Sequence, residues 1–346
     1  MTTTVNIPAA TAVPGHTHTT AAIEAHGLVK TFKTKSGENR AVDGVDLVVQ
    51  PGTVYGVLGP NGAGKTTTVR MLATLLRPDA GTAKVFGYDV ERHPQAVRSL
   101  VGLTGQYASV DEELTATQNL MVFGRLLGLS RKAARTRTGE LLDEFSLAEA
   151  ADRPLKDFSG GMRRRLDLAA SLIATPPLLF LDEPTTGLDP RTRAQMWDTI
   201  RRLVAEGATV LLTTQYLDEA DQLADRIAVI DHGRVIADGT ADELKSSIGT
   251  STLQLTPADR ADAARAAEVI EQILSETATL SPEAGRITAP MRRADLMADI
   301  LLALRGENIA VEEMNVQKPT LDEVFLTITG QPTDDQSDST TEEINQ

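Results

Sequence analysis

The sequence predicts a doubly wound α/β fold around a parallel sheet. Residues 178–181, 209–212 and 227–230 are continuous apolar runs, which are typical of strands buried on both faces of a parallel sheet. Between the first two runs, Ile200 and Val204 lie on one helical face, so a helix connects these two strands. This alternation of strand and helix is the pattern of an α/β core.

The elements before this core differ in kind. Residues 23–49 have a strand-like pattern with a turn at 36–39, and they predict an antiparallel β part at the N-terminal end. Residues 54–58 form an apolar strand that leads into a glycine-rich loop. The apolar spacing over 69–76 predicts a helix after this loop, which should end at the breaker residues 77–79.

Shifts in composition predict the division of the chain. We expect a disordered arm over 1–21, a main α/β domain over 22–249 with a helical subdomain at about 112–165, a small C-terminal α/β accessory domain over 250–330, and an acidic disordered tail over 331–346. The arm and the tail contain few apolar side chains that could offset the entropy of folding.

The C-terminal accessory domain shows a mixed pattern of strands and helices. We expect strands over 253–255 and 286–289, and helices over 258–276 and 291–305. Thr320 and Glu323 have the spacing of a capping box at the start of a further helix. One apolar face of that helix consists of Leu321, Val324, Phe325 and Ile328, and this face must pack against another part of the protein.

Composition and charge exclude several classes of protein. The net charge of −14 argues against general binding to nucleic acid, which requires a basic surface. The 346 residues contain no cysteine, so disulfides and thiolate catalysis are excluded. No segment reaches the roughly 20 apolar residues of a membrane-spanning helix. A role in transport would therefore need a pore formed by another chain.

A glycine-rich segment has the pattern of a phosphate-binding loop, G-x-x-x-x-G-K-[ST]. In such loops backbone N–H groups surround phosphate oxygens, the lysine contacts the β- and γ-phosphates, and the hydroxyl of the last residue can bind Mg²⁺. The helix that follows adds a favourable N-terminal dipole. We expect the nucleotide to be bound by Gly59, Pro60, Asn61, Gly62, Ala63, Gly64, Lys65, Thr66 and Thr67.

Two carboxylates follow the apolar run at 178–181. Asp182 at the end of this predicted strand can reach Mg²⁺, usually through water. Glu183 is suited to polarising a water molecule for attack on the γ-phosphate. An apolar strand that ends in Asp-Glu is a weak signal by itself, but its position downstream of a phosphate-binding loop makes it a strong one.

Ser159, Gly160 and Gly161 precede a predicted helix, for which Ser159 is a good N-cap. Arginines occupy positions 163–165, in the first turn of this helix. Positive side chains there oppose the helix dipole, which favours negative charge at this end. A helix that meets an anion could tolerate this mismatch, but the arginines are a weak signal by themselves.

Taken together, these motifs resemble the nucleotide-binding subunit of an ABC transporter. The resemblance covers about residues 22–246 and consists of the motifs at 59–66, Gln106, 159–161, 182–183, 187–189 and 213–216, in the order typical of that family. Within the family, the chain most resembles the daunorubicin/doxorubicin-resistance ATP-binding proteins of actinobacteria. That closer match rests on the stretches 104–112, 212–221 and 321–326.

The resemblance implies roles for further residues. Phe32 would stack on adenine, and Gln106 would contact Mg²⁺ or the attacking water. Ser159, Gly160 and Gly161 would bind the γ-phosphate that the other protomer holds, and Asp189 would lie at the dimer contact.

Three positions depart from the usual family pattern. Phe158 and Met162 flank the Ser-Gly-Gly motif, where leucine and glutamine are usual. Gln215 stands where a histidine is usual. Its amide can donate a hydrogen bond to the γ-phosphate, but it cannot carry a proton at neutral pH, so we expect Gln215 to position the phosphate rather than act as an acid or base.

The resemblance also implies a function. Two copies would pair head-to-tail with two ATP molecules and Mg²⁺ between them, on the cytoplasmic face of the membrane beneath a separately encoded permease. ATP hydrolysis would then drive export of a hydrophobic drug, an anthracycline-like antibiotic or a lipid. Two alternatives remain: a soluble ATPase of the same family that acts on ribosomes or DNA, and a nucleotide-binding regulator that hydrolyses little because of Gln215.

Overall fold

The computed structural model describes residues 21–34, 37–105, 110–249, 251–281, 285–293 and 295–330. The arm expected over 1–21 and the tail expected over 331–346 lie outside the described residues, apart from Ala21, which is buried. Within the described part of the chain, no helix is both long enough and apolar enough to cross a membrane.

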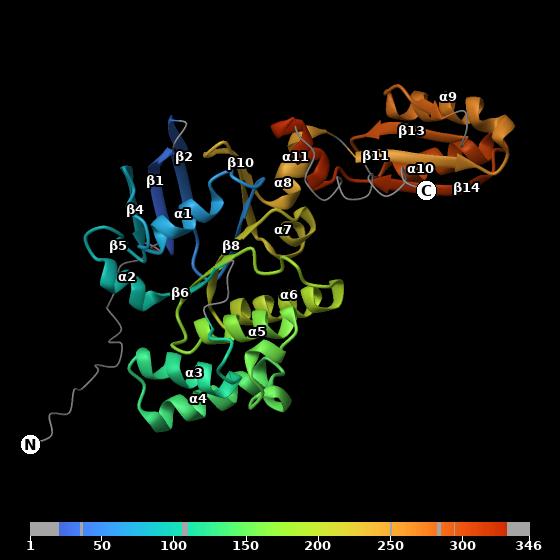
Figure 1. Ribbon diagram of the computed structural model, residues 1–346. Helices are drawn as coiled ribbons and strands as arrows, with labels where there is room; N and C mark the ends of the chain where they lie inside the picture. Colours follow the sequence, from blue (N-terminus) through green and yellow to red (C-terminus); the bar gives the residue numbers. More distant parts are fainter. Residues whose placement is uncertain are drawn as a thin grey trace, which may run out of the picture.

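A six-stranded sheet in the order β10-β9-β3-β8-β7-β6 forms the centre of the fold (Figure 1). Its strands are β3 (Val54–Leu58), β6 (Val101–Thr104), β7 (Leu178–Asp182), β8 (Thr209–Thr214), β9 (Arg226–Asp231) and β10 (Arg234–Gly239). All neighbours pair in parallel except β10, which pairs antiparallel with β9 at the edge. The three apolar runs are therefore β7, β8 and β9, and the predicted α/β fold is confirmed.

The apolar runs are continuous because the central sheet is covered on both faces. On β7, Leu178 and Phe180 pack with the N-terminal part of the protein. Leu179 and Leu181 point the other way and pack with a cluster of helices. All four side chains are fully buried, so neither face of this strand could carry polar residues without a loss of stability.

The N-terminal part is a second, antiparallel sheet in the order β2-β1-β4-β5. It consists of β1 (Ile23–Thr34), β2 (Gly37–Val49), β4 (Ala80–Val85) and β5 (Tyr88–Asp89). The turn predicted at 36–39 is wrong in its position, because Gly37 already pairs with Thr34 and β2 begins there. The two strands form a longer hairpin than their pattern suggested.

Eight helices of the described chain accompany these two sheets. They are α1 (Lys65–Leu72), α2 (Pro94–Leu100), α3 (Ala116–Leu126), α4 (Arg131–Glu144), α5 (Gly160–Ser171), α6 (Pro190–Ala205), α7 (Leu217–Leu223) and α8 (Ala241–Ile248). The segment between α4 and α5 contains two 3₁₀ turns, Ala148–Ala150 and Leu155–Asp157. In Figure 1, α3 and α4 lie beyond α5 as seen from the central sheet.

Helix α1 is shorter than its apolar spacing predicts. It ends at Leu72 rather than at residues 77–79, because Thr74 adopts a left-handed conformation with φ of 63°. The backbone N–H groups of Leu75 and Leu76 then both donate to the carbonyl of Arg70. Leu76 still packs on the core, so its apolar character reflects burial and not helical structure.

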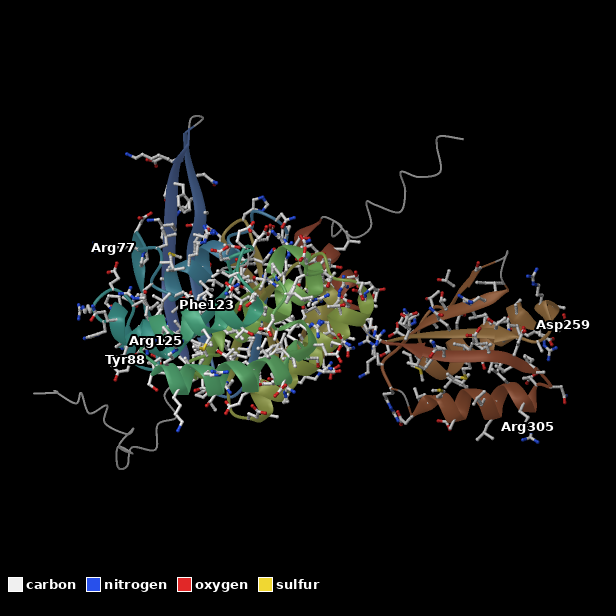
Figure 2. The ribbon with its side chains drawn as sticks, turned by 60° about the horizontal axis from the view of Figure 1, so that its bottom comes forward. Arg77, Tyr88, Phe123, Arg125, Asp259 and Arg305 are labelled. Carbon is white, nitrogen blue, oxygen red and sulfur yellow. The ribbon has the colours of Figure 1, made fainter. Side chains whose placement is uncertain are left out.

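The C-terminal part forms a third sheet in the order β12-β13-β11-β14, and all its pairings are antiparallel. Its elements are β11 (Ser251–Pro257), β12 (Thr279–Ser281), β13 (Arg286–Met291), β14 (Val311–Gln317), α9 (Ala263–Leu274) and α10 (Leu296–Gly306). Both helices are shorter than expected. Strands β12 and β14 were not predicted, because their apolar residues do not alternate regularly with polar ones. Figure 2 shows Asp259 and Arg305 at the end of this unit that lies farthest from the other two sheets.

The last helix, α11 (Leu321–Thr329), returns to the first part of the protein. Thr320 and Glu323 form the predicted capping box. The apolar face of α11 packs on α7, α8 and the central sheet instead of on the third sheet, and Phe325 shares a buried cluster with Leu58 and Leu217. In Figure 1, α11 lies beside α8. The third sheet is therefore anchored at both of its chain ends, by α8 and by α11.

Truncation of the buried face of α11 should destabilise the protein. Phe325 is 2% exposed, and removing a buried phenylalanine side chain costs about 3–5 kcal/mol. We expect Phe325→Ala to lower the free energy of unfolding in urea by an amount in this range. The control is the neighbouring Leu326→Ala, because Leu326 is 50% exposed and its loss should change stability by no more than about 0.5 kcal/mol. Equal effects of the two variants would contradict this packing of α11.

Candidate nucleotide-binding site

The glycine-rich segment connects β3 to α1 as a tight loop. Gly64 is the residue before α1 and has a φ of 106°. A Cβ atom at this position would lie 2.3 Å from the carbonyl oxygen of Ala41, so no other residue fits without moving the backbone of β2. The first N–H groups of α1 have no partners within the helix, which makes this end suitable for an anion.

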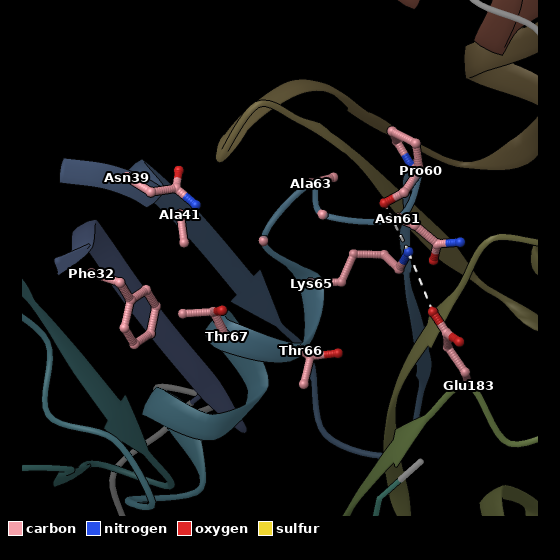
Figure 3. A pocket seen from close by; sticks show the side chains of 12 residues that line it. Phe32, Asn39, Ala41, Pro60, Asn61, Ala63, Lys65, Thr66, Thr67 and Glu183 are labelled. Carbon is pink, nitrogen blue, oxygen red and sulfur yellow. Dashed lines mark hydrogen bonds and ion pairs between the residues drawn. The ribbon is translucent and has the colours of Figure 1, made fainter. Parts of the chain in front are cut away.

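A cavity of about 300 Å³ lies over this loop (Figure 3). It is lined by Phe32, Asn39, Ala41, Pro60, Asn61, Gly62, Ala63, Gly64, Lys65, Thr66, Thr67 and Glu183. All of the predicted loop residues therefore line it except Gly59. No motif pointed to Asn39 and Ala41, which come from β2. Phe32 is 38% exposed, so one surface of its ring is available for stacking.

Lys65 places a buried cation between the loop and the end of β7. Its Nζ donates to the carbonyls of Gly59 at 2.6 Å and Pro60 at 3.1 Å. The same nitrogen lies 3.5 Å from Oε1 of Glu183, and both side chains are less than 10% exposed. Gly59 thus acts through its carbonyl, although it does not line the cavity. Phosphate oxygens in the cavity would compete with these partners for the Lys65 cation.

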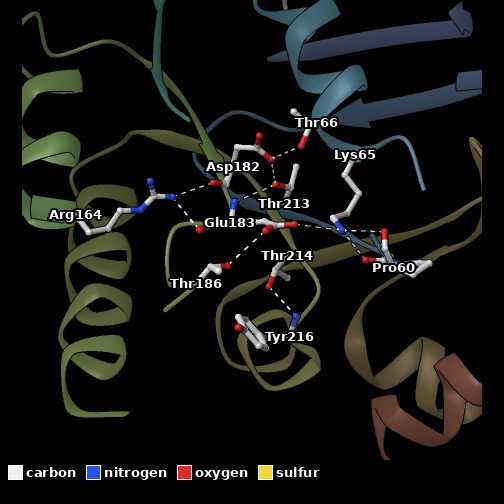
Figure 4. A network of polar contacts seen from close by, with 11 residues as sticks. Pro60, Lys65, Thr66, Arg164, Asp182, Glu183, Thr186, Thr213, Thr214 and Tyr216 are labelled. Atoms are coloured by element: carbon white, nitrogen blue, oxygen red, sulfur yellow. Dashed lines mark hydrogen bonds and ion pairs between the residues drawn. The ribbon is translucent and has the colours of Figure 1, made fainter. Parts of the chain in front are cut away.

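Asp182 is joined to the start of α1 by a direct hydrogen bond. Thr66 Oγ1 donates to Asp182 Oδ1 at 3.0 Å, and Thr213 Oγ1 of β8 donates to the same oxygen at 2.5 Å (Figure 4). A hydroxyl and a carboxylate side by side fit Mg²⁺, which proteins commonly bind through one or two oxygens together with the phosphates of a substrate. Thr213 lies in the motif at 213–216, but the sequence did not predict this contact, since a threonine within a strand carries no distinctive signal.

Glu183 and Gln215 follow neighbouring strands at the same edge of the sheet. The backbone N–H of Glu183 donates to the carbonyl and to Oγ1 of Thr213. Gln215 comes directly after β8, and its Oε1 is buried without a hydrogen-bond partner among the described residues. A buried oxygen in this condition can be satisfied by water or by a ligand. Gln106, the remaining predicted catalytic residue, lies outside the described residues.

The Ser-Gly-Gly motif does not reach the cavity of its own chain. Ser159 caps α5 by accepting a hydrogen bond from the N–H of Met162 at 3.3 Å, as predicted. None of the described residues that line the cavity belongs to this motif. Within one chain, the phosphate-binding loop and Ser159 therefore lie at separate sites.

The Ser-Gly-Gly motif instead packs against the segment that contains Asp189. Asp189 caps α6 by accepting hydrogen bonds from the N–H and the hydroxyl of Thr192 at 3.0 and 2.7 Å, and these bonds hold the pKa of its carboxyl below the usual value. A Cβ atom at Gly161 would lie 2.6 Å from Cγ2 of Thr192. The starts of α5 and α6 are thus in direct contact.

The three arginines on α5 give no support of their own to the expectation that this helix meets an anion, because each of them is bound within the chain. Arg163 pairs with Glu112 at 2.8 Å, and Arg165 donates to the carbonyl of Phe145. Arg164 donates to backbone carbonyls at the end of β7. All three side chains thus bind acceptors of their own chain, and these acceptors offset the unfavourable position of the charges at the helix N-terminus.

This fold and site define the ATP-binding cassette of an ABC transporter. The ABC transporter family matches residues 42–186, and the C-terminal domain of the DrrA1-3-like ATP-binding proteins matches residues 239–329. The chain is 56% identical to the daunorubicin/doxorubicin resistance ATP-binding protein DrrA of Streptomyces peucetius, over 93% of this chain and 96% of the relative. It therefore belongs to this family of ABC transporter ATP-binding proteins. It is an ATP-hydrolysing subunit of an exporter.

Other relatives and solved structures agree with this assignment. The chain is 45% identical to the doxorubicin resistance ATP-binding protein DrrA of Mycobacterium tuberculosis strain H37Rv, over 90% of this chain and 95% of the relative. The structure of an ATP-binding subunit of an ABC transporter is 29% identical with a TM-score of 0.59, over 66% of this chain and 93% of that one. A dimeric ATP-binding cassette bound to ADP and Pi shares the fold at 24% identity and a TM-score of 0.59, over 63% of this chain and 98% of that one.

The contact between α5 and α6 can be tested by adding one methyl group. We expect Gly161→Ala to lower the free energy of unfolding by about 1–3 kcal/mol, the usual cost of overpacking, because the new methyl would meet Thr192. Gly160→Ala is the matched control, since a Cβ there would meet no atom within 4 Å. Adding Thr192→Ser to Gly161→Ala removes the clashing Cγ2 and should restore stability. If the double variant remains as unstable as Gly161→Ala, the predicted contact is not the cause.

Proposed function

We propose that two copies of this chain pair head-to-tail and enclose two ATP molecules. The main support is the separation, within one chain, of the cavity over Lys65 from the motif at 159–161. In a head-to-tail pair, the Ser-Gly-Gly motif of one protomer would complete the cavity of the other and bind the γ-phosphate there. Asp189, which lies beside Gly161, would reach the same contact between protomers.

Within each cavity, we assign the nucleotide contacts to residues that already line it. Phe32 stacks on the adenine through its exposed ring, and the N–H groups and side chains from Pro60 to Thr67 bind the phosphates. Lys65 leaves its carbonyl partners and contacts the β- and γ-phosphates. Gly59 supports this loop through its carbonyl.

A magnesium ion would be held by Thr66 and by Asp182, the latter directly or through water, with Gln106 as a further ligand. The support is the 3.0 Å contact between the Thr66 hydroxyl and the Asp182 carboxylate. When bound, the ion supplies positive charge to the β- and γ-phosphates. The Thr213 hydroxyl, which donates to Asp182, fixes the orientation of that carboxylate.

Hydrolysis proceeds by in-line attack of a water molecule that Glu183 orients. The carboxylate of Glu183 accepts a hydrogen bond from this water and raises its nucleophilicity. The amide of Gln215 donates to a γ-phosphate oxygen, and Lys65 stabilises the negative charge of the transition state. Gln106 would contact the same water.

The names of the relatives support a proposal for the transported substrate and the location. We propose that the chain acts at the cytoplasmic face of the membrane as a peripheral subunit of a separately encoded permease. The cargo is a hydrophobic drug, an anthracycline-like antibiotic or a lipid, in keeping with relatives named for daunorubicin and doxorubicin resistance. An ATPase of ribosomes or DNA is not favoured, since these relatives match the chain over nine-tenths of its length.

We retain the division of the chain as a proposal, with an ATP-binding domain over 22–249, a helical subdomain at about 112–165 and an accessory domain over 250–330. The packing of α11 on α7 and α8 means that the accessory domain would respond to movements near the cavity, because α7 follows Gln215 directly.

Replacing Glu183 with Gln should preserve ATP binding and lower steady-state turnover by at least about 100-fold, because positioned acid–base groups contribute about 10²–10⁴-fold. Turnover is measured as phosphate release by the purified chain, and affinity is measured with a fluorescent ATP analogue. Glu206→Gln, at an exposed position, is the control for loss of one carboxylate. Turnover within twofold of the wild type would remove Glu183 from the mechanism.

The shared site predicts complementation between two defective chains. Lys65→Ala removes the phosphate-binding cation, and Ser159→Arg blocks the Ser-Gly-Gly motif. A mixed dimer has one site with both defects and one site with neither, so a mixture of the two variants should regain ATP-dependent dimerisation in analytical ultracentrifugation. Each variant alone should remain monomeric. If the folded, exchanging variants associate no better when mixed, each site must be complete within one chain.

A further inference from the structure

Arg164 donates four hydrogen bonds to backbone carbonyls near the site, and the proposed mechanism gives it no role. Its Nη2 donates to the carbonyls of Asp182 and Glu183, both at 2.9 Å (Figure 4). Its Nε donates to the carbonyl of Pro184 at 2.8 Å. Three successive carbonyl dipoles thus converge on one guanidinium. Without a cation among them, these oxygens would be buried close together and would repel one another.

The backbone that Arg164 binds is strained at Glu183. This residue has a φ of 50°, in the left-handed region that costs a residue with a side chain roughly 1–2 kcal/mol. Such a conformation persists when neighbouring contacts impose it. Thr213 binds the N–H of Glu183 from one side, and Arg164 binds its carbonyl from the other. These two contacts hold the turn in which the carboxylate reaches Lys65 and lines the cavity.

Arg164 also links this turn to a second strand end. Its Nη1 donates to the carbonyl of Gly105 at 2.5 Å, directly after β6. Strands β6 and β7 are parallel neighbours that pair Thr104 with Leu181. One planar side chain therefore connects the ends of two adjacent strands to the N-terminal half of α5. A guanidinium can do this because its five donors point in fixed directions, whereas a lysine offers its donors from a single atom.

The charge of Arg164 is itself well compensated. Its side chain is 11% exposed, and burial lowers the pKa of the guanidinium. Four neighbouring carboxylates raise this pKa, and they belong to Asp167, Asp182, Glu219 and Glu183. The side chain remains charged, since the guanidinium of arginine does not lose its proton in proteins. The positive charge is thus available to the converging carbonyls throughout the working pH range.

We propose that Arg164 is a positioning residue for hydrolysis, which holds the Glu183 turn so that its carboxylate points at the attacking water. This inference rests on the role of Glu183 proposed above. It predicts an effect on turnover and none on nucleotide binding, because Arg164 contacts no residue of the phosphate-binding loop in the described structure. Misplacement of a catalytic group by about 1 Å can lower a rate by about 100-fold.

The test compares Arg164→Lys with Arg165→Lys. Both variants keep the charge on the same turn of α5, but Arg165 donates to Phe145 and to no carbonyl near the site. We expect Arg164→Lys to lower kcat about 10- to 100-fold, while KM and the affinity for an ATP analogue change less than twofold. Arg165→Lys should keep kcat within twofold. The thermal unfolding midpoint is measured for every variant.

Arg164→Gln serves as a second variant, since an amide donates two hydrogen bonds without charge, and it replaces Arg164→Lys if that protein does not fold. Unchanged kcat in a folded variant would overturn the proposal. A parallel loss of kcat, nucleotide affinity and thermal stability would also overturn it, since that would indicate a general structural role. Failure of both variants to fold would overturn it as well.

Glu183→Gln is measured alongside. If it remains active, the proposed role of Glu183 fails; if it is inactive while Arg164→Lys is fully active, only the role of Arg164 fails.

Discussion

The site depends on the parallel pairing of β3, β8 and β7, which brings three chain segments to one edge of a buried sheet. Val57 pairs with Thr213, and Asp182 pairs with the same Thr213 from the other side. The carboxyl ends of these strands consequently coincide. Thr66, which follows β3, and Asp182, at the end of β7, are 116 residues apart in the chain and share a hydrogen bond. Lys65 and Glu183, which follow β3 and β7, meet across the cavity for the same reason.

Folding this edge of the sheet carries an electrostatic cost, because the ends of several strands, the start of a helix and several buried charges meet there. The protein satisfies these groups with its own side chains. Lys65 binds two carbonyls of the phosphate-binding loop, and Arg164 binds four carbonyls at the ends of β6 and β7. Buried cations with several directed hydrogen bonds offset the cost of desolvation. The strand ends are therefore held in place before a nucleotide enters, whereas Lys65 would exchange its carbonyl partners for phosphate oxygens.

Two helices, and not a broad interface of its own strands, connect the third sheet to the part of the protein that holds the nucleotide-binding site. Helix α8 leads into the sheet, and α11 returns from it to pack on α7. Because α7 begins two residues after Gln215, a continuous line of packed elements runs from the switch position to the accessory unit. The apolar face of α11 is buried against the ATP-binding part of the protein.

The sequence alone determined the α/β class, the phosphate-binding loop, the Asp182 strand end and the caps at Ser159 and Thr320, because each depends on local spacing or on continuous burial. Tertiary structure decided what spacing cannot encode. Helix α1 ends early through the left-handed Thr74. The arginines of α5 appeared suited to an anion, yet each binds acceptors that the chain brings from elsewhere in the sequence. Which acceptors surround a side chain is settled only when distant segments pack together, and that is why the role of Arg164 emerged from the fold.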